Sequence, residues 1–107
     1  MLKMNHAEFS ISKTVLRALI ELTGQPQLDV AIPMALRDAV EHRLQQIEAT
    51  IQTYEDKYGL SFSEFEARGR DGTLPDRFSY EVEHDYFEWD SLVTRRAKLQ
   101  EIRQWLS

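Results

Sequence analysis

The sequence predicts an all-α protein, a long-helix hairpin or bundle with a short helical corner, and three observations lead to this prediction. Two long segments carry apolar residues at the three- and four-residue spacing of helices. Ser61 and Glu64, between these segments, have the spacing of a capping box at the start of a helix. Gly24 and Gly59 lie where helices are expected to end. A chain of 107 residues has the usual length of one domain, so residues 1–107 are predicted to form a single helical domain.

Composition limits the classes of function. The formal net charge of −5 argues against broad attraction to nucleic-acid phosphates. The absence of cysteine excludes disulfides, thiolate zinc sites and cysteine nucleophiles, and it favours a reducing compartment. The start of the chain lacks the apolar run of a signal peptide, and no stretch approaches the roughly 20 apolar residues of a membrane span. We therefore expect a cytoplasmic protein without a membrane partner.

The first predicted element is a short helix over residues 12–24. Ser10 or Ser12 can accept a hydrogen bond from an otherwise unpaired amide at its start. Gly24 suits a left-handed helix end, and Pro26 prevents the helix from resuming. The apolar face of this helix is wide, so the helix is expected to dock on another element.

A short strand is predicted at residues 28–32, because Leu28, Val30 and Ile32 alternate with other residues. A strand followed by a proline-led helix resembles the opening of the ribbon-helix-helix fold, which implies a dimeric DNA-binding element. Asp29 stands where a basic side chain would read the major groove, which argues against DNA binding through this strand. Pairing of the strand across a homodimer remains open.

A long helix is predicted over residues 33–58. Six of its apolar or aromatic residues are spaced alternately four and three apart, which is a heptad seam that requires a partner helix. The seam consists of Val40, Leu44, Ile47, Ile51, Tyr54 and Tyr58. The partner helix could belong to the same chain or to a second copy, and an intertwined homodimer is expected.

A short helical corner follows the long helix. Gly59 ends the long helix, and Ser61 and Glu64 form a capping box at the start of a short helix over residues 61–68. A turn-rich connection then leads to a second long helix, predicted over residues 82–106. The apolar pattern does not fix the first turn of this helix.

One stretch of the second long helix offers metal-ligand chemistry. Glu81, His84, Asp85 and Glu88 are three and four residues apart, so their side chains share one helix face. The helical di-iron pattern requires two Glu-x-x-His pairs, whereas only Glu81 and His84 form such a pair here. The acids are better explained as a polar face at the positive end of the helix dipole. No metal and no cofactor are therefore predicted.

The same stretch is the predicted binding surface for a partner protein. Residues 79–90 contain five acids, four aromatic residues and no Lys or Arg. Aromatic rings supply contact area, while acids attract and orient a basic partner. The predicted partner-binding residues are Tyr80, Glu83, Asp85, Tyr86, Phe87, Glu88, Trp89 and Asp90. In the alternative interpretation, Tyr86 and Trp89 belong to the core and the acids only face water.

The sequence contains no recognisable catalytic motif. Its three histidines have no serine nucleophile in a known context, and no glycine-rich phosphate loop is present. The basic residues of the final helix suit the negative end of the helix dipole, with a small phosphate-contacting patch as the alternative. The protein is therefore predicted not to be an enzyme.

Two stretches resemble the small acidic antitoxins of bacterial toxin–antitoxin modules. They are YEDKYGLSFSEFEARG, which starts at Tyr54, and EVEHDYFEWDSLVTRRAKLQEI, which starts at Glu81. In those proteins a heptad helix ends in a Lys-Tyr-Gly-hydrophobic-Ser-Phe corner, here residues 57–62. An acidic helix that contains tryptophan, here Trp89, then follows. The resemblance covers residues 39–102 and implies neutralisation of a toxin, often a nuclease, by covering its basic active surface.

These observations predict a non-enzymatic protein-interaction module. In the favoured hypothesis it is a homodimer that binds and neutralises a small basic protein such as a cognate toxin, encoded by a neighbouring gene. A helical structural or scaffold protein that self-associates is the main alternative. A small transcriptional regulator that binds DNA is a further one.

Overall fold

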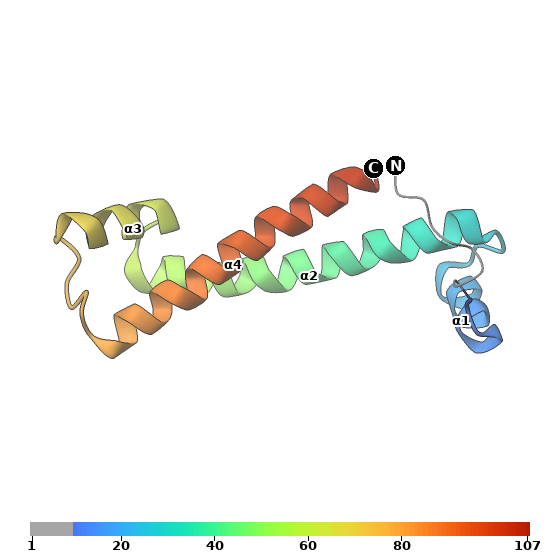
Figure 1. Ribbon diagram of the computed structural model, residues 1–107, viewed down its shortest axis with the longest axis horizontal. Helices are drawn as coiled ribbons and strands as arrows, with labels where there is room; N and C mark the ends of the chain where they lie inside the picture. Colours follow the sequence, from blue (N-terminus) through green and yellow to red (C-terminus); the bar gives the residue numbers. More distant parts are fainter. Residues whose placement is uncertain (1–9) are drawn as a thin grey trace. The chain divides into compact units, whose positions relative to one another are not determined.

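The computed structural model describes residues 10–107 and confirms the all-α fold class. The described residues form the helices α1 (Lys13–Thr23), α2 (Leu28–Tyr58), α3 (Phe62–Asp71) and α4 (Tyr80–Trp105), and no strand (Figure 1). Contacts divide the chain into two compact units, the N-terminal unit of residues 1–39 and the hairpin unit of residues 40–107. No helix within residues 10–107 has both the length and the apolar character needed to cross a membrane.

The N-terminal unit contains α1 and the first turns of α2. Ser12 caps α1 by accepting a hydrogen bond from the amide of Val15 at 3.2 Å. Gly24 ends the helix in the left-handed conformation, with φ of 68°, and its amide donates to the carbonyl oxygen of Ile20 at 2.9 Å. Both ends of α1 therefore agree with the caps expected from the sequence. None of the residues of α1 is fully buried.

The strand predicted at residues 28–32 is wrong, because these residues form the first turns of α2. Alternation over only five residues also fits the three- and four-residue spacing of a helix. Leu28, Ala31 and Ile32 share one helix face, on which Ala31 is fully buried and the other two are half-buried. Pro33 lies inside the helix, in its second turn, where its ring nitrogen donates no backbone hydrogen bond. The strand of a ribbon-helix-helix element is thus not formed.

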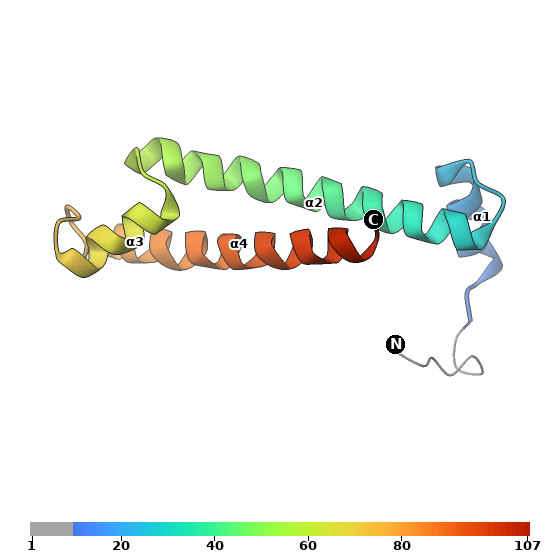
Figure 2. The ribbon, with the colours of Figure 1, turned by 90° about the horizontal axis from the view of Figure 1, so that it is seen from above.

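In the hairpin unit, α4 returns alongside α2, and α3 forms the corner between them (Figures 1 and 2). The seam of α2 is the inner face of this hairpin. Four seam residues are buried and two are half-buried, and they pack in two clusters with residues of α3 and α4. The residues that α4 contributes to the buried core are Val82, Trp89 and Leu99. The partner helix of the seam is therefore α4 of the same chain.

The corner helix α3 begins as the sequence predicts and ends later. The side chain of Ser61 accepts from the amide of Glu64, and the side chain of Glu64 accepts from the amide of Ser61, both at 3.2 Å. The hydrogen bond from the Ser61 amide to the Glu64 carboxylate lowers the pKa of Glu64. The predicted end at residue 68 is too early, because Gly69 lies inside the helix, which continues to Asp71. The end falls at Gly72, whose φ of 77° stops the helical hydrogen-bond pattern.

Helix α4 begins at Tyr80, two residues before the predicted start, and ends at Trp105. Ser79 caps it, because its hydroxyl accepts a hydrogen bond from the amide of Val82 at 3.2 Å. Glu81 and Glu83 lie in the first turn, where the helix dipole favours negative charge.

Candidate protein-interaction surface

Trp89 lies at the centre of the core and not on a binding surface. Its side chain is 0% exposed. Four rings surround it, with centroid distances of 5.6 Å to Tyr54, 6.1 Å to Tyr58, 5.3 Å to Phe62 and 5.1 Å to Phe65. The prediction that Trp89 contacts a partner protein is therefore corrected. The alternative interpretation, in which this tryptophan is a core residue, describes its position.

Asp85 is also buried, and it links α4 to the end of α2. Its carboxylate accepts hydrogen bonds from the Lys57 ammonium at 2.6 Å and from the Tyr58 hydroxyl. Burial alone would raise the pKa of Asp85, but the bonds from Lys57 and Tyr58 outweigh burial and lower the pKa. Because these bonds occupy its carboxylate, Asp85 is a structural residue of the hairpin and does not directly face a partner.

Two further members of the predicted partner-binding set also make contacts within the chain. Glu88 accepts a hydrogen bond from the Tyr54 hydroxyl, which joins α4 to α2. The Tyr86 hydroxyl donates to Glu66 at 2.9 Å, and the Tyr86 ring stacks on Phe62 at a centroid distance of 5.8 Å. Tyr86 thereby fastens α4 to α3. The hydroxyls of the seam tyrosines are directed to acids of α4.

The buried face of α4 has its own heptad pattern. Val82, Asp85, Trp89 and Leu99 are buried, and Leu92 between them is half-buried. These positions continue the alternation of three and four residues that marks a helix seam. Asp85 and Arg96 interrupt the pattern, so the spacing of apolar residues alone reveals only part of it. The signal for this face is a heptad pattern in which one buried acid, Asp85, is paired with Lys57 at the end of α2.

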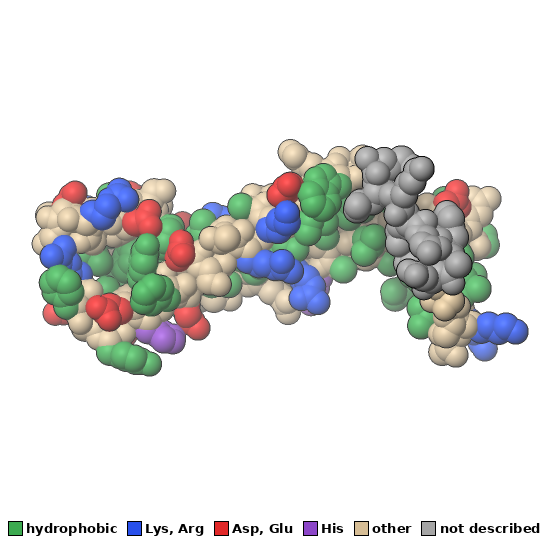
Figure 3. All heavy atoms as spheres, in the orientation of Figure 1, with side chains coloured by type: hydrophobic (Ala, Val, Ile, Leu, Met, Phe, Trp, Pro, Cys, Tyr) green, Lys and Arg blue, Asp and Glu red, His purple; other side chains and the backbone are tan. Residues whose placement is uncertain are grey.

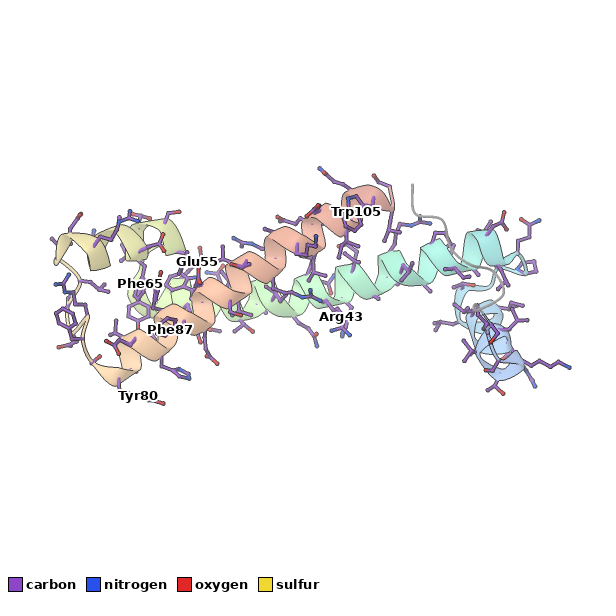
Figure 4. All side chains as sticks on the ribbon, viewed as in Figure 1. Arg43, Glu55, Phe65, Tyr80, Phe87 and Trp105 are labelled. Carbon is purple, nitrogen blue, oxygen red and sulfur yellow. The ribbon has the colours of Figure 1, made fainter. Side chains whose placement is uncertain are left out.

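The remaining members of the predicted set form one exposed row on α4. Tyr80, Glu83, Phe87 and Asp90 are three and four residues apart and therefore lie along one side of the helix. We call these four residues the outer row. Tyr80 is 83% exposed and Phe87 is 68% exposed. Figure 4 shows Tyr80 pointing away from the helices at the start of α4, whereas Phe65 lies between α3 and α4.

The acids of the outer row are not neutralised within the described chain. Neither Glu83 nor Asp90 has an ion-pair partner among residues 10–107. By contrast, Glu81 forms an ion pair with Lys57 at 2.7 Å. The outer row thus presents two exposed rings and two carboxylates that remain available to a cation from outside.

A hollow of about 450 Å³ lies beside the outer row, between α3, the connection after it and the start of α4. Phe65, Leu74 and Val82 are buried lining residues with apolar side chains. Phe78 and Phe87 also line the hollow and are largely exposed. Figure 3 shows hydrophobic, acidic and basic side chains together at this end of the hairpin unit, and Arg70 and Arg77 are among the residues that line the hollow. The hollow can receive an apolar side chain from another molecule.

Arg77 orders one wall of the hollow. Its guanidinium donates a hydrogen bond to the carbonyl oxygen of Gly69 in α3. The same group lies 4.4 Å from the centroid of the Phe78 ring, a cation–π distance. Sequence reasoning missed Phe78 as a surface residue, because the alternation of Phe78, Tyr80 and Val82 suggested an extended segment, whereas Phe78 lies in the connection and the other two lie in α4.

No family model, curated protein or solved structure matches this chain.

The four candidate metal ligands do not gather around an open site. Lys57 lies between Glu81 and Asp85 and binds both carboxylates, at 2.7 and 2.6 Å. Glu88 is bound by a tyrosine hydroxyl, and His84 is 4.0 Å from the other oxygen of Asp85. Within the described residues, no group of three or more metal-ligating side chains is suitably placed. A lysine ammonium takes the position between these acids that a metal ion would need.

The two halves of α4 carry opposite charge. Residues 79–90 contain five acids and no basic residue. The second half contains one acid, Glu101, and four basic residues, which are Arg95, Arg96, Lys98 and Arg103. Two of these basic side chains are partly neutralised, since Lys98 lies 3.4 Å from Glu101 and Arg103 lies 3.3 Å from Glu41. Figure 3 shows basic side chains over the second half of α4. The acidic half is the one that borders the hollow.

Proposed function

We propose that this chain is a non-enzymatic protein-interaction module of the antitoxin type, which binds a basic partner protein through the outer row and the adjacent hollow. One observation carries this proposal. Two large aromatic side chains, Tyr80 and Phe87, stand exposed on a helix that is fixed from behind by the buried Trp89. Phe87 borders the mainly apolar hollow, and the two rings alternate along α4 with acids that have no ion-pair partner among the described residues.

The rings and the hollow supply the binding free energy in this proposal. Exposed apolar side chains that cluster beside a concave surface are typical of interaction sites. The backbone at Phe87 is already ordered in α4, so little backbone conformational entropy is lost when a partner binds. A side chain of the partner that fills the hollow would contact buried apolar groups, which is the arrangement of an interface hot spot.

The acids of the outer row orient the partner and raise the rate of association in this proposal. Glu83 and Asp90 lie between or beside the exposed rings, so a basic partner surface would approach them first. Opposite charge raises the association rate, whereas a second acidic protein would be repelled. The chain's net charge of −5 acts in the same direction.

The resemblance of residues 39–102 to small acidic antitoxins extends this proposal to the identity of the partner. A toxin whose active surface is basic has the chemistry that the outer row would recognise. A small basic protein encoded by a gene adjacent to that of this chain is the expected partner. DNA is not proposed as a partner, because residues 28–32 are helical and form no strand that could enter a groove.

The proposal is tested by co-expressing the chain with the small basic protein of the adjacent gene and measuring their affinity by titration calorimetry. Phe87→Ala should raise the Kd by about tenfold or more, as expected for an aromatic hot spot. The matched control is Trp105→Ala, because Trp105 is 64% exposed and lies at the other end of the same helix. This control should leave the Kd within a factor of about two.

The contribution of charge is tested with Glu83→Lys, which should slow association and lose its effect at high salt. Glu48→Lys makes the same charge change on the exposed side of α2 and serves as its control. Failure of any adjacent-gene protein to bind, or equal losses in test and control variants, would reject the proposed surface. A self-associating scaffold without a partner would produce the first of these outcomes.

A further inference from the structure

We infer that the hollow beside the outer row binds an arginine side chain of the partner protein. This inference rests on the proposed function, because it names the chemical group that a basic partner inserts. In this arrangement the guanidinium lies against the Phe87 ring and pairs with the Glu83 carboxylate. The methylene groups of the arginine contact the apolar floor of the hollow.

The outer row and the hollow share two residues. Glu83 and Phe87 line the hollow, whereas Tyr80 and Asp90 do not. Glu83 and Phe87 are four residues apart in α4, so the carboxylate and the ring are neighbours on one side of the helix. Both side chains are exposed. A group that enters the hollow from solvent therefore meets a carboxylate and an aromatic ring together.

The charges around the hollow select a cation. Its charged lining residues are Glu66, Arg70, Arg77 and Glu83. Arg77 donates to the carbonyl oxygen of Gly69 near the C-terminal end of α3, where the helix dipole favours positive charge. Arg70 lies 3.8 Å from Glu66. Glu83 has neither an ion pair nor a side-chain hydrogen bond within the described residues. The charged group that remains without a partner is thus an anion.

The floor and walls of the hollow favour arginine over lysine. Leu74 and Val82 form part of a buried apolar floor, which suits methylene groups. The aromatic lining residues are Phe65, Phe78, Tyr86 and Phe87. A guanidinium is planar and weakly hydrated, so it stacks on such rings and can pair with a carboxylate through two hydrogen bonds. A lysine ammonium is strongly hydrated and loses more on entering an apolar hollow.

The chain already places one guanidinium against a ring of this hollow. The Arg77 guanidinium lies 4.4 Å from the centroid of the Phe78 ring, on the wall formed by the connection. Among the described residues, no cation lies over the Phe87 ring, which belongs to the opposite wall on α4. A second guanidinium against Phe87 repeats a contact that the hollow makes with its own arginine.

A purely apolar side chain matches the hollow less completely. It would cover Leu74 and Val82, but it would also displace water from the Glu83 carboxylate without replacing the lost hydrogen bonds. An arginine covers the same floor and pairs with this carboxylate. Arginine is also one of the residues that most often anchor protein interfaces.

The first experiment is a nuclear magnetic resonance titration of the isotope-labelled full chain with blocked tripeptides. Their sequence is acetyl-Ala-X-Ala-amide, where X is arginine, lysine, citrulline or phenylalanine. Shifts of the Leu74, Val82 and Phe87 amides report binding to the hollow. The arginine peptide should bind with a Kd about threefold or more below that of the lysine peptide. Citrulline has the shape of arginine without its charge, so its peptide should bind more weakly than the arginine peptide.

Substitutions locate the contacts of the guanidinium. Glu83→Gln removes the carboxylate charge and should raise the Kd of the arginine peptide by about threefold or more, with a smaller effect at high salt. Its effect on the phenylalanine peptide should be small. The matched control is Glu48→Gln, the same change at an exposed position of α2 that does not line the hollow.

The contribution of the ring is tested with Phe87→Leu, which keeps an apolar side chain and removes the cation–π contact. It should raise the Kd of the arginine peptide by about threefold. Trp105→Leu removes an exposed ring at the other end of α4 and should leave this Kd unchanged. The substituted positions are all exposed, so circular dichroism should show unchanged helix content.

Three results would overturn the inference. One is tighter binding of the phenylalanine peptide than of the arginine peptide, which would make the hollow an apolar pocket. Another is equal binding of the arginine peptide and either the lysine or the citrulline peptide. The third is the absence of binding by any of the peptides.

The inference and the proposed function fail in different ways. If the small basic protein of the adjacent gene binds through Phe87 but the arginine peptide does not bind, the inference is wrong and the proposed function stands. If the arginine peptide binds as expected but no adjacent-gene protein does, the proposed partner is wrong. The selectivity of the hollow for arginine is then still supported.

Discussion

The ammonium of Lys57, in the last turn of α2, lies 2.6 Å from the carboxylate of Asp85 on the buried face of α4. Asp85 also accepts a hydrogen bond from Tyr58, so two groups of α2 hold one carboxylate of α4. These contacts lie on the same inner face as Trp89. The ion pair therefore fixes the register of the hairpin at the end where α3 connects the two long helices.

This pair makes the stability of the hairpin unit dependent on pH. The pKa of Asp85 in the folded chain is below its ordinary value of about 3.9, so the unfolded chain binds a proton first as pH falls. The stabilisation is fully present above that ordinary value and is lost as pH falls through the lowered pKa. Asp85→Asn should therefore lower the melting temperature at pH 7, and the difference from wild type should shrink below about pH 4.

Thermal unfolding followed by circular dichroism between pH 2.5 and pH 7 measures this difference. Asp76→Asn is a suitable control, because Asp76 is exposed in the connection and has no ion-pair partner among the described residues. A pH-independent effect of Asp85→Asn would mean that the carboxylate does not gain from its lysine partner.

The seam tyrosines should ionise at unusually high pH. Burial, followed by the hydrogen bond to Glu88, raises the pKa of Tyr54 to about 12. Burial, followed by the hydrogen bond to Asp85, raises the pKa of Tyr58 to about 12. Because the folded pKa values are raised, this stabilisation is present below about pH 10 and is lost as pH rises towards 12.

Absorbance titration at the phenolate band measures this directly. Tyr54→Phe and Tyr58→Phe should each remove one late-titrating group and cost about 0.5–1.5 kcal/mol at pH 7, the usual net contribution of a hydrogen bond. Tyr80→Phe is the control for stability, since Tyr80 is exposed and lies outside the core clusters. Ionisation of both seam tyrosines near pH 10 would contradict their buried hydrogen bonds.

Features determined by local chemistry could be predicted from the sequence. Ser61 and Glu64 are three residues apart and hydrogen-bond to each other's backbone, so the start of α3 could be predicted without the tertiary fold. The seam of α2 was also predictable, because its spacing extends over five turns. The short segment at residues 28–32 was not, since five residues of alternation fit a strand or a helix equally well.

The faces of α4 could not be assigned from the sequence, because they depend on how α4 pairs with α2. Trp89 and Phe87 are two residues apart and lie on different sides of the helix, so the pairing buries one and exposes the other. Asp85 lies on the inner face of α4, so the sequence of that face resembles a polar surface and not a buried one. The hollow was also unpredictable, since three separate segments enclose it.

Arg77 should control the order of the connection between α3 and α4. Its bond to the carbonyl oxygen of Gly69 and its contact with the Phe78 ring both hold the connection against α3. Arg77→Ala should raise the rate of amide hydrogen exchange in residues 72–79 by about tenfold while leaving exchange in the α2 seam unchanged. Arg95→Ala, a change of an exposed arginine in the second half of α4, is the control. Unaltered exchange after Arg77→Ala would mean that these contacts do not order the connection.

The two tryptophans should behave oppositely in fluorescence. Trp89 is 0% exposed, whereas Trp105 is 64% exposed and lies 5.2 Å from the Lys98 ammonium. In a Trp105→Phe variant the remaining emission should be blue-shifted and resist acrylamide, because Trp89 is shielded by the surrounding rings. In a Trp89→Phe variant the remaining emission should be red-shifted and readily quenched. Similar quenching in the two variants would contradict the buried position of Trp89.

Replacing Trp89 should also test how much of the stability of the hairpin unit depends on its aromatic core. Trp89→Ala should cost about 3–5 kcal/mol through lost burial and the cavity that remains, a large fraction of the stability of a small domain. Trp89→Phe should cost clearly less, because the ring contacts are partly retained and the indole nitrogen has no hydrogen-bond partner to lose within the described residues. Denaturant unfolding at pH 7 measures both, with Trp105→Ala as the exposed control. Equal losses from the Ala and Phe variants would contradict the view that the ring contacts retained by phenylalanine carry part of the stabilisation.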